Sequence, residues 1–513
     1  MKVAIRHYAF PTYEMQLPLN WLADPYKNKN WRHHLNSLRW LSGIHGLVEK
    51  KKVLVDFYRQ HCVKKKRNPF YSTMQGDHTA AIRVDIFLTL KRLFLEKGLT
   101  SGVGICNRLL QEELKNLQRK EMYRTGHNHG MMVDLAILEA CEVEPNLTKF
   151  VDIDLVLKRS SRTLGEMWSL SGYTKEHSIS YQEYNLPLTI SYFEKLVSLG
   201  FDSSSFIQED FLKNETKRIL GYSLRASGEY FPVGDSFRQP NRKILRSVYP
   251  ENSKGIDSPS QILAPYSMEK GCVVKEGLVI RKWQGKYNKL MHIIVTCGWN
   301  SFSHKQNDEF SFCFDVDGVP IFDDAGYSTA CSKQVTDFLK SENAHSNFSL
   351  KNYAWSDKKV PDGNSILETF CSPESSDSEC GIQKINMQHG RFSGLTATRD
   401  VVFNDHGFRI IDGLNSKAEN SCRDVDESLV ICHRFVLSPD VSVEITDDSV
   451  MLKSDGVICS LSFEFGKASV IKIPWVSKEK HKIFETNAIQ IVSQRNVRDR
   501  PLNYFSVEVL NGD

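Results

Sequence analysis

Apolar residues in the first half of the chain recur with the period of a helix. Between about Asp85 and Gly221 they are spaced three and four positions apart, which places them on one face of a helix. Successive stripes of this kind comprise Ile86, Leu90, Leu93 and Phe94, then Leu109, Leu110, Leu114 and Leu117, then Met131, Leu135, Leu138 and Ala140. Short connections between such helices predict helix hairpins that stack side by side.

The period changes to that of a β-strand after about Gly271. Apolar and polar residues alternate from Phe310 to Val316, as in a strand with one buried face. Asp317 and Gly318 follow, a pair that favours a two-residue hairpin turn. Further short apolar runs, separated by turn residues, predict an antiparallel β-sandwich or a large antiparallel sheet.

This change of period divides the chain into parts. We predict a helical domain over residues 1–235, a linker over residues 236–270 and an antiparallel β domain over residues 271–513. The fold class is therefore a multidomain α+β protein. The length of 513 residues agrees with this division, because domains typically have roughly 100–200 residues.

The composition is that of an ordinary soluble globular protein, with 41% hydrophobic and 25% charged residues. Lys and Arg number 66 against 62 for Asp and Glu, which is too balanced to predict a nucleic-acid partner. No apolar run reaches the roughly 20 residues of a membrane span, and the opening residues do not resemble a signal peptide. The 12 cysteines are scattered, which favours free thiols. The expected location is therefore cytoplasmic, with unconventional export and the oligomeric state left open.

Polar residues interrupt the apolar pattern at the predicted start of two helices. The first segment, Gly126 to Gly130 (GHNHG), precedes the helix that carries Met131. Asn128 is a good N-cap, so helix capping alone explains this segment, but amide and imidazole donors at a helix N-terminus also suit an anionic ligand. The second segment, residues 176–182 (EHSISYQ), contains a tyrosine that either packs in the core or takes part in catalysis.

A third polar segment lies in the β half of the chain. Residues 303–308 (SHKQND) lead into residues 322–326 (FDDAG) and, later, into residues 344–347 (AHSN). Polar side chains are common at strand edges, so the segment needs no special explanation. The His and Asp side chains of these three stretches could also hold a metal ion.

Taken together and in this order, these segments resemble the heparinase II/III-like polysaccharide lyases. The matching stretches are NWLADPYKNKNWRHHLNSLRWL, HNHG, EHSISYQEYN, EYFPVGDS and SHKQNDEFSFCFDVDGVPIFDDAG, with CHRFVLSPDV as a weaker match. The resemblance implies an incomplete (α/α) toroid at the N-terminus and an antiparallel β-sandwich at the C-terminus. It also implies an enzyme that cleaves an acidic, uronic-acid-containing polysaccharide or oligosaccharide by β-elimination.

The resemblance further implies roles for particular side chains. Asn128 and His129 would neutralise the substrate carboxylate, which otherwise repels the charge that develops as the C5 proton leaves. Tyr181 would act as general acid, or as acid and base together in a syn elimination. His304 would be the base in an anti elimination.

Two departures from the family pattern bear on a metal ion. Gln306 stands where the family has a second histidine, and Ala325 replaces the proline of an Asp-Pro-Gly turn. The matching trio of metal ligands is therefore Gln306, Asp324 and His345. Glutamine is a poor zinc ligand, although its carbonyl oxygen suits harder ions. We predict no tightly held zinc and no required cofactor, and a structural divalent metal stays open.

Weaker expectations concern the substrate and the class of protein. Arg83 is expected to grip a carboxylate or sulfate, since arginine forms bidentate pairs with such groups, and Glu176 is a second substrate-binding residue in this interpretation. A glycoside hydrolase on a similar toroid would need two carboxylates, and nothing in the sequence pairs Glu176 with Asp235. A non-catalytic glycan-binding or surface-polysaccharide assembly protein is the other alternative.

Overall fold

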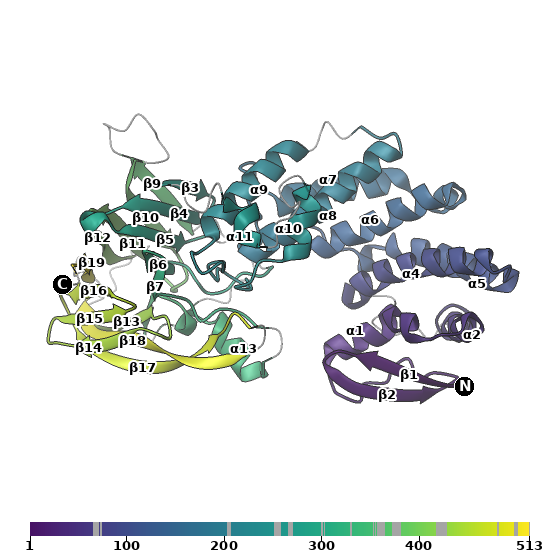
Figure 1. Cartoon of the computed structure of the whole chain (residues 1–513), viewed down its shortest axis with the longest axis horizontal. Coiled ribbons are helices and arrows are strands. Elements are labelled where there is room, and N and C mark those ends of the chain that lie inside the picture. The colour runs from purple at the N-terminus through teal and green to yellow at the C-terminus, as the bar shows by residue number, and fades with distance from the viewer. Residues whose placement is uncertain are drawn as a thin grey trace. The chain divides into compact units, whose positions relative to one another are not determined.

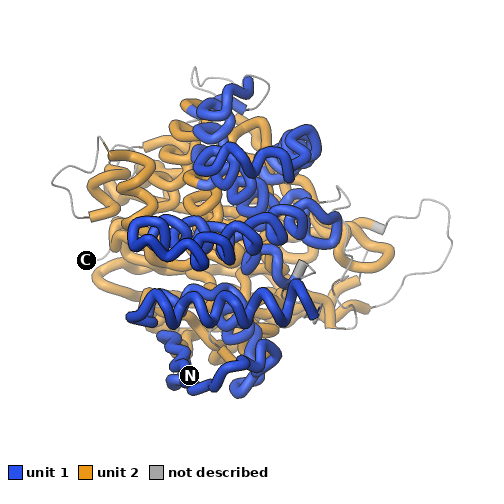
Figure 2. The backbone as a smooth tube through the Cα atoms, turned by 90° about the vertical axis from the view of Figure 1, so that its right-hand side faces the viewer, with its two compact units in different colours: residues 1–167, 188–209 blue, residues 168–187, 210–513 orange. Residues whose placement is uncertain are grey.

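The computed structural model describes two compact units (Figure 2), which do not follow a single cut in the sequence. Unit 1 comprises residues 1–167 and 188–209, and unit 2 comprises residues 168–187 and 210–513. The described residues are 1–64, 71, 74–202, 207–250, 258–264, 270–298, 301, 303–328, 331–351, 353, 355, 365–371, 381–416, 428–479, 482–496 and 501–511.

Helices dominate the first half of the chain, after a short hairpin (Figure 1). The hairpin pairs β1 (Lys2–His7) with β2 (Phe10–Gln16) in antiparallel orientation. The α-helices that follow are α1 (Lys29–Ser37), α2 (Leu47–Tyr58), α4 (Asp77–Glu96), α5 (Thr100–Leu117), α6 (Asn128–Val143), α7 (Ile153–Met167), α8 (Ile179–Ser198), α9 (Glu209–Ser223), α10 (Arg242–Val248) and α11 (Pro259–Ile262). The shorter helical turns are η1 (Arg39–Gly43), η2 (Arg59–Val63), η3 (Met74–Gly76), η4 (Lys120–Met122) and η5 (Pro145–Phe150), of which η2 is a π-helical turn.

The helices predicted from the apolar stripes are present. All four predicted stripe residues of α5 are buried, whereas the buried face of α4 is rotated from the predicted one, with Phe87 buried and Ile86 half-buried. The hairpin β1–β2 was not predicted, and its second strand has no apolar alternation that would reveal it, since β2 buries Met15 alone. Helices α10 and α11 lie in the stretch predicted as a linker. Among the described residues, no helix is long and apolar enough to cross a membrane.

Antiparallel sheets make up the second half, as predicted. The strands are β3 (Gly271–Lys275), β4 (Leu278–Gln284), β5 (Leu290–Thr296), β6 (Phe312–Val316), β7 (Val319–Phe322), β8 (Phe348–Leu350), β9 (Ile366–Cys371), β10 (Ile382–His389), β11 (Leu395–Asn404), β12 (Gly407–Ser416), β13 (Ser428–Val436), β14 (Ser442–Ile445), β15 (Ser449–Ser454), β16 (Val457–Phe463), β17 (Lys467–Val476), β18 (Ile483–Asn496) and β19 (Asn503–Leu510). In the described parts of unit 2 the strand orders are β3-β4-β5-β6-β7, β14-β15-β16-β19-β12-β11-β10-β9 and β17-β18-β13-β8. The helix α13 (Lys333–Lys340) follows β7 in the chain. Closure of the helices into a toroid and of the sheets into a sandwich stays a prediction.

The hairpin predicted after Val316 is present. Strands β6 and β7 are joined by Asp317 and Gly318, whose φ angles of 50° and 79° are typical of a type I′ turn. All residues of β6 are buried, and the carboxylate of Asp315 among them pairs with Arg225 at 3.2 Å. This strand therefore lacks the exposed face that its alternating sequence predicts.

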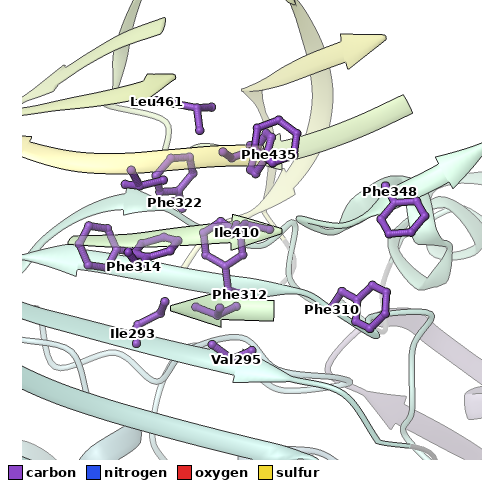
Figure 3. Close-up of a cluster of buried hydrophobic side chains, with 14 of the residues drawn as sticks. Ile293, Val295, Phe310, Phe312, Phe314, Phe322, Phe348, Ile410, Phe435 and Leu461 are labelled. Atoms are coloured by element: carbon purple, nitrogen blue, oxygen red, sulfur yellow. The ribbon is translucent and has the colours of Figure 1, made fainter. Parts of the chain in front are cut away.

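A hydrophobic core in unit 2 draws its side chains from all three of these sheets (Figure 3). The ring of Phe312 in β6 lies 5.4 Å from that of Phe408 in β12 and 6.2 Å from that of Phe435 in β13, measured between centroids. Such aromatic contacts add to the burial of apolar area. Because β6 follows directly after residues 303–308, this core anchors the polar segment that the sequence singles out.

We predict that Phe312→Ala lowers the free energy of unfolding of unit 2 by about 3–5 kcal/mol, the usual loss for a buried phenylalanine. Phe484→Ala is the matched control, because Phe312 is 2% exposed and Phe484 is 55% exposed. The control should change the free energy by no more than about 0.5 kcal/mol. Urea unfolding of the full chain measures both. Equal losses in the two variants would contradict the description of this core.

Candidate active site

Three polar segments of unit 2 meet at Gly234. A Cβ atom at this position would lie 2.3 Å from the carbonyl oxygen of His177 and 2.9 Å from that of His304, and the φ angle of Gly234 is +56°. The backbone N–H of Asp235 donates to the His304 carbonyl oxygen at 2.9 Å. Only glycine permits both this conformation and this approach. The structure thus joins the segments EHSISYQ, PVGDS and SHKQND, which the sequence presents separately.

The two histidines at this crossing have strained backbones. The φ angle is +51° at His177 and +60° at His304, in the left-handed region that residues other than glycine seldom adopt. Strain of this kind persists where the surrounding structure imposes it, and it is concentrated at functional sites. The conformation of the His304 backbone is therefore an independent indication that this loop has a role beyond packing.

The side chains of Tyr181 and His304 stack against each other. Their ring centroids are 3.4 Å apart and the ring planes are inclined by 14°. Tyr181 is half-buried and is the third residue of α8, as the sequence predicts for the start of a helix. Burial raises the pKa of Tyr181, and the nearby Tyr327 and Glu176 raise it further. The hydroxyl therefore keeps its proton at neutral pH and is available as a donor.

The imidazole of His304 lies between two buried carboxylates. Its Nδ1 atom is 3.4 Å from Asp235 Oδ2, and its Nε2 atom is 3.8 Å from Glu176 Oε2. Asp235 also pairs with Lys340 Nζ at 2.8 Å and accepts a hydrogen bond from Gln306 Nε2 at 2.9 Å. Asp235 thus connects the histidine to a partly exposed cation. Lys340 was missed at the sequence level, since it lies in α13 and carries no motif.

Two serines tie the start of α8 to the same crossing. The Oγ atoms of Ser178 and Ser236 are 2.9 Å apart, and Ser236 Oγ accepts from the backbone N–H of Ile179 at 2.8 Å. The first N–H groups of a helix have no partner within the helix, so an oxygen from elsewhere in the chain satisfies one of them. This contact fixes the first turn of α8, which carries Tyr181, relative to the loop that carries Asp235.

Two of the three residues predicted to bind a metal, Asp324 and His345, are in contact. Asp324 Oδ2 lies 2.7 Å from His345 Nδ1, whereas the amide of Gln306 is bonded to Asp235. Burial lowers the pKa of His345, but the charge and hydrogen bond of Asp324 outweigh it and leave the pKa above its ordinary value.

A lysine supplies positive charge close to that pair. The buried Lys305 ammonium pairs with Asp308 and lies 3.6 Å from Glu309 Oε2. Within the described residues, no group of three or more His, Cys, Asp or Glu side chains could hold a metal ion. Gln306 Oε1 and His345 Nε2 are each buried with no hydrogen-bond partner in that part of the chain. Of these atoms the glutamine oxygen is a poor zinc ligand. That no zinc is tightly held stays a prediction, and we derive no chemical step through a metal.

Asn128 and His129 lie at the start of α6 in unit 1. The N-cap is His127 and not Asn128, because the His127 Nδ1 atom accepts from the backbone N–H of His129 at 3.1 Å. This corrects the prediction that Asn128 caps the helix. The Asn128 side chain is instead buried within the first turn, and its Oδ1 atom has no hydrogen-bond partner among the described residues. Capping therefore does not account for Asn128.

The ring of His129 is oriented by a buried aspartate. His129 Nδ1 lies 3.0 Å from Asp77 Oδ1, and Arg124 Nε lies 2.8 Å from the other oxygen of the same carboxylate. Burial raises the pKa of Asp77, but the hydrogen bond from His129 and the charge of Arg124 lower it more strongly, so the net pKa is below its ordinary value. The carboxylate stays ionised and holds His129 through Nδ1. That Asn128 and His129 act together with Tyr181 stays a prediction.

Arg83 does not reach a surface. It is fully buried, its Nε atom lies 2.6 Å from Glu113 Oε1, and its Nη1 atom donates to the Asn36 carbonyl oxygen at 2.9 Å. This placement argues against the prediction that Arg83 grips the substrate. The partner Glu113 lies in the next helix, so the local sequence around Arg83 could not reveal the pair. Glu176 is also fully buried, behind His304.

Comparisons with known proteins agree with this architecture. Residues 279–501 match the family model described as Heparinase II/III-like, C-terminal. A crystal structure of heparinase III matches with a TM-score of 0.70 and 13% identity over 96% of this chain and 80% of that one. A mutant heparan sulfate lyase HepC from Pedobacter heparinus matches with a TM-score of 0.64 and 13% identity over 99% and 81%. A heparinase III with methylated lysines matches with a TM-score of 0.65 and 16% identity over 98% and 82%.

These structures share the fold of the chain, and at such identities they show the fold alone. A search of curated proteins found no match. The family model covers most of the β region and includes His304, Asp324 and His345.

We predict that Gly234→Ala destabilises unit 2 more than Gly228→Ala does. Both glycines have a positive φ angle, +56° and +80°, but a Cβ atom at Gly228 meets nothing within 4 Å. The control therefore isolates the cost of the left-handed conformation, roughly 1–2 kcal/mol. Gly234→Ala adds the collision with His177 and His304.

Urea unfolding measures the two losses of stability, and the NMR shift of the His304 ring reports whether it still stacks on Tyr181. Equal losses, with an unchanged His304 signal in Gly234→Ala, would refute the close crossing.

Proposed function

We propose, from the premise that the chain belongs to the heparinase II/III-like family, that it is a polysaccharide lyase which cleaves a uronic-acid-containing glycan by β-elimination. The observation that carries the proposal is the stacked pair of Tyr181 and His304, held by Asp235. Such a pair offers a protonated phenol and an oriented imidazole at one place. An elimination needs one group that removes a proton and one that supplies a proton.

The proposed reaction breaks the C4–O bond of a uronate without taking up water. A base removes the C5 proton, the electron pair of that C–H bond forms the C4–C5 double bond, and the departing oxygen takes a proton from an acid. Tyr181 donates that proton, because its raised pKa keeps the hydroxyl protonated. In an anti elimination His304 accepts the C5 proton. A syn elimination, in which Tyr181 performs both transfers, first requires loss of the Tyr181 proton, which its raised pKa disfavours.

The surroundings of His304 suit the role of a base. Asp235 lies beside Nδ1, which favours the tautomer with a proton on that atom and leaves Nε2 as the acceptor. Glu176 lies 3.8 Å from Nε2 and faces the positive charge that the ring acquires when it takes the C5 proton. Lys340 adds a cation beside Asp235, at a side chain that is 40% exposed. We assign it a supporting role in attracting the substrate carboxylate.

The neutralisation of that carboxylate is assigned to Asn128 and His129. The enolate that forms as the C5 proton leaves is stabilised by donors aimed at the carboxylate oxygens. The group of Asn128 that could donate to a carboxylate is its Nδ2 amide. Asp77 holds the ring of His129 through Nδ1, so this ring is oriented before any substrate binds.

The positions of the carboxylates disfavour the glycoside hydrolase alternative. Glu176 and Asp235 both flank His304, but they are 0% and 2% exposed. Asp235 is already engaged by Lys340 and Gln306. A hydrolase needs two carboxyl groups that reach opposite sides of the scissile bond. The ordered pair of Tyr181 and His304 also disfavours a purely glycan-binding protein, which has no need of an acid and a base.

We predict that Tyr181→Phe lowers turnover by about 10²–10⁴-fold, the usual effect of removing a positioned acid or base. Substrate affinity and melting temperature should stay near their wild-type values, because phenylalanine preserves the ring that stacks on His304. Tyr184→Phe is the matched control, since Tyr184 lies on the same helix, with its ring 6.0 Å from that of Tyr181, and is 39% exposed. Its turnover should be nearly unchanged.

The assay follows the near-ultraviolet absorbance of the C4–C5 double bond while acidic polysaccharides are screened: glycosaminoglycans, alginates and bacterial capsules. Retention of more than about a third of wild-type turnover in Tyr181→Phe would remove this residue from the mechanism. Cleavage without absorbance would identify a hydrolase, and binding without cleavage would identify a glycan-binding protein.

A further inference from the structure

A basic pocket in unit 1 is lined in part by residues of helix α2. Figure 1 shows this helix. Its volume is about 510 Å³, within the range of small-molecule sites. The cations that line it are Lys51, Lys52, Arg59 and Lys64. None of these residues belongs to the catalytic assignments made above. The pocket is therefore a separate feature that the proposed lyase reaction does not use.

The one acidic residue in the lining, Asp56, offsets at most one of the four positive charges. Asp56 is buried, and its Oδ2 atom accepts hydrogen bonds from the backbone N–H of Leu19 at 3.0 Å and from Trp21 Nε1 at 3.1 Å. The carboxylate is thus directed inward, where it holds the segment after β2 against α2. Its structural role is satisfied without any lysine or arginine.

The cations themselves point to a ligand from outside the protein. Lys52, Arg59 and Lys64 are exposed, and none of them has an acidic partner in the part of the chain that the structure describes. Lys51 Nζ contacts only a neutral group there, the hydroxyl of Ser101, at 3.1 Å. Four positive charges around one pocket repel one another, and an anion relieves that repulsion.

The π-helical turn η2 directs two of the cations to the pocket. Lys64 N–H donates to the Arg59 carbonyl oxygen at 2.9 Å, five residues back, so the turn is wider than in an α-helix. His61 of this turn is fully buried and stacks on Phe57, with ring centroids 4.2 Å apart. The core thus holds the inner side of the turn, while Arg59 and Lys64 lie on its outer side. Turns of this kind are frequent at functional sites.

We propose that this pocket is a second binding site for an acidic glycan, which holds a carboxylate or sulfate group of a sugar unit that is not being cleaved. Leu17, Pro18 and Val55 supply an apolar surface for the face of a sugar ring, and Arg59 offers the paired donors that suit planar or tetrahedral anions. A nucleic acid is the less suitable ligand, because the lining has no aromatic ring on which a base could stack. The inference rests on the proposed function only for the identity of the glycan.

The test compares two charge-matched triple variants of the full chain. The pocket variant carries Lys52→Gln, Arg59→Gln and Lys64→Gln, and the control carries Lys97→Gln, Arg108→Gln and Lys158→Gln, which removes two lysines and one arginine at exposed positions of the same unit outside the pocket. Both are made in the Tyr181→Phe background, so that the measured affinity does not depend on cleavage. The probes are a heparan sulfate oligosaccharide, an oligogalacturonate, neutral dextran and single-stranded DNA of matched charge.

The pocket variant should raise the Kd for one of the two acidic glycans by about tenfold or more, because three charged contacts are lost together, while the control changes it by less than about twofold. This difference should shrink at high salt, which screens exposed charges. Equal effects of the two variants would overturn the inference, as would a parent protein that binds neither acidic glycan better than dextran. DNA that binds as tightly as the glycans, with the same dependence on the pocket, would also overturn it. The test measures binding and not turnover. Its outcomes can therefore be interpreted even if the lyase proposal fails.

Discussion

The arrangement around Tyr181 depends on one close approach of the backbone at Gly234. The carbonyl oxygens of His177 and His304 come so near that a Cβ atom at this position would collide with both. Once the two loops cross there, the serines on either side connect the start of α8 to the same loop, and Tyr181 lies against His304. A tyrosine and a histidine more than a hundred positions apart in the chain thus become one stacked pair.

The rings of Tyr181 and His304 have different electrostatic surroundings. Burial raises the pKa of Tyr181 and keeps its proton in place. Asp235 and Glu176 flank the nitrogens of His304, and Asp235 shares its charge with Lys340. In the proposed β-elimination the tyrosine gives a proton and the histidine receives one. Unit 1 also contains a histidine whose Nδ1 atom lies beside a buried aspartate: Asp77 orients the ring of His129.

Local patterns in the sequence predict the features that depend on near neighbours along the chain. The stripe of leucines in α5 and the turn at Asp317 and Gly318 are of this kind, and both are present. Features set by distant partners are missed. Arg83 is paired with Glu113 across two helices, and Asp315 is buried in β6 because Arg225 neutralises it.

In the candidate site, too, the sequence predicts what depends on near neighbours and misses what depends on distant partners. The segment that carries Tyr181 could be found from its polar residues at the start of a helix, and the family resemblance indicated His304. The cap at His127 could not be predicted, because an imidazole is not among the side chains that usually cap helices. Lys340 could not be predicted either, since only the folded chain brings α13 to Asp235.

The most direct test of the lyase account is the mass of the products, measured by mass spectrometry after the full chain has cleaved a uronate oligosaccharide of known mass. β-Elimination adds nothing to the substrate, so the masses of the two fragments should sum to the mass of the starting oligosaccharide. The fragment from the reducing side of the cleaved bond carries the new double bond at its non-reducing end and should weigh one water less than the corresponding saturated oligosaccharide. Fragments that together weigh one water more than the substrate would contradict the account, because they would show hydrolysis.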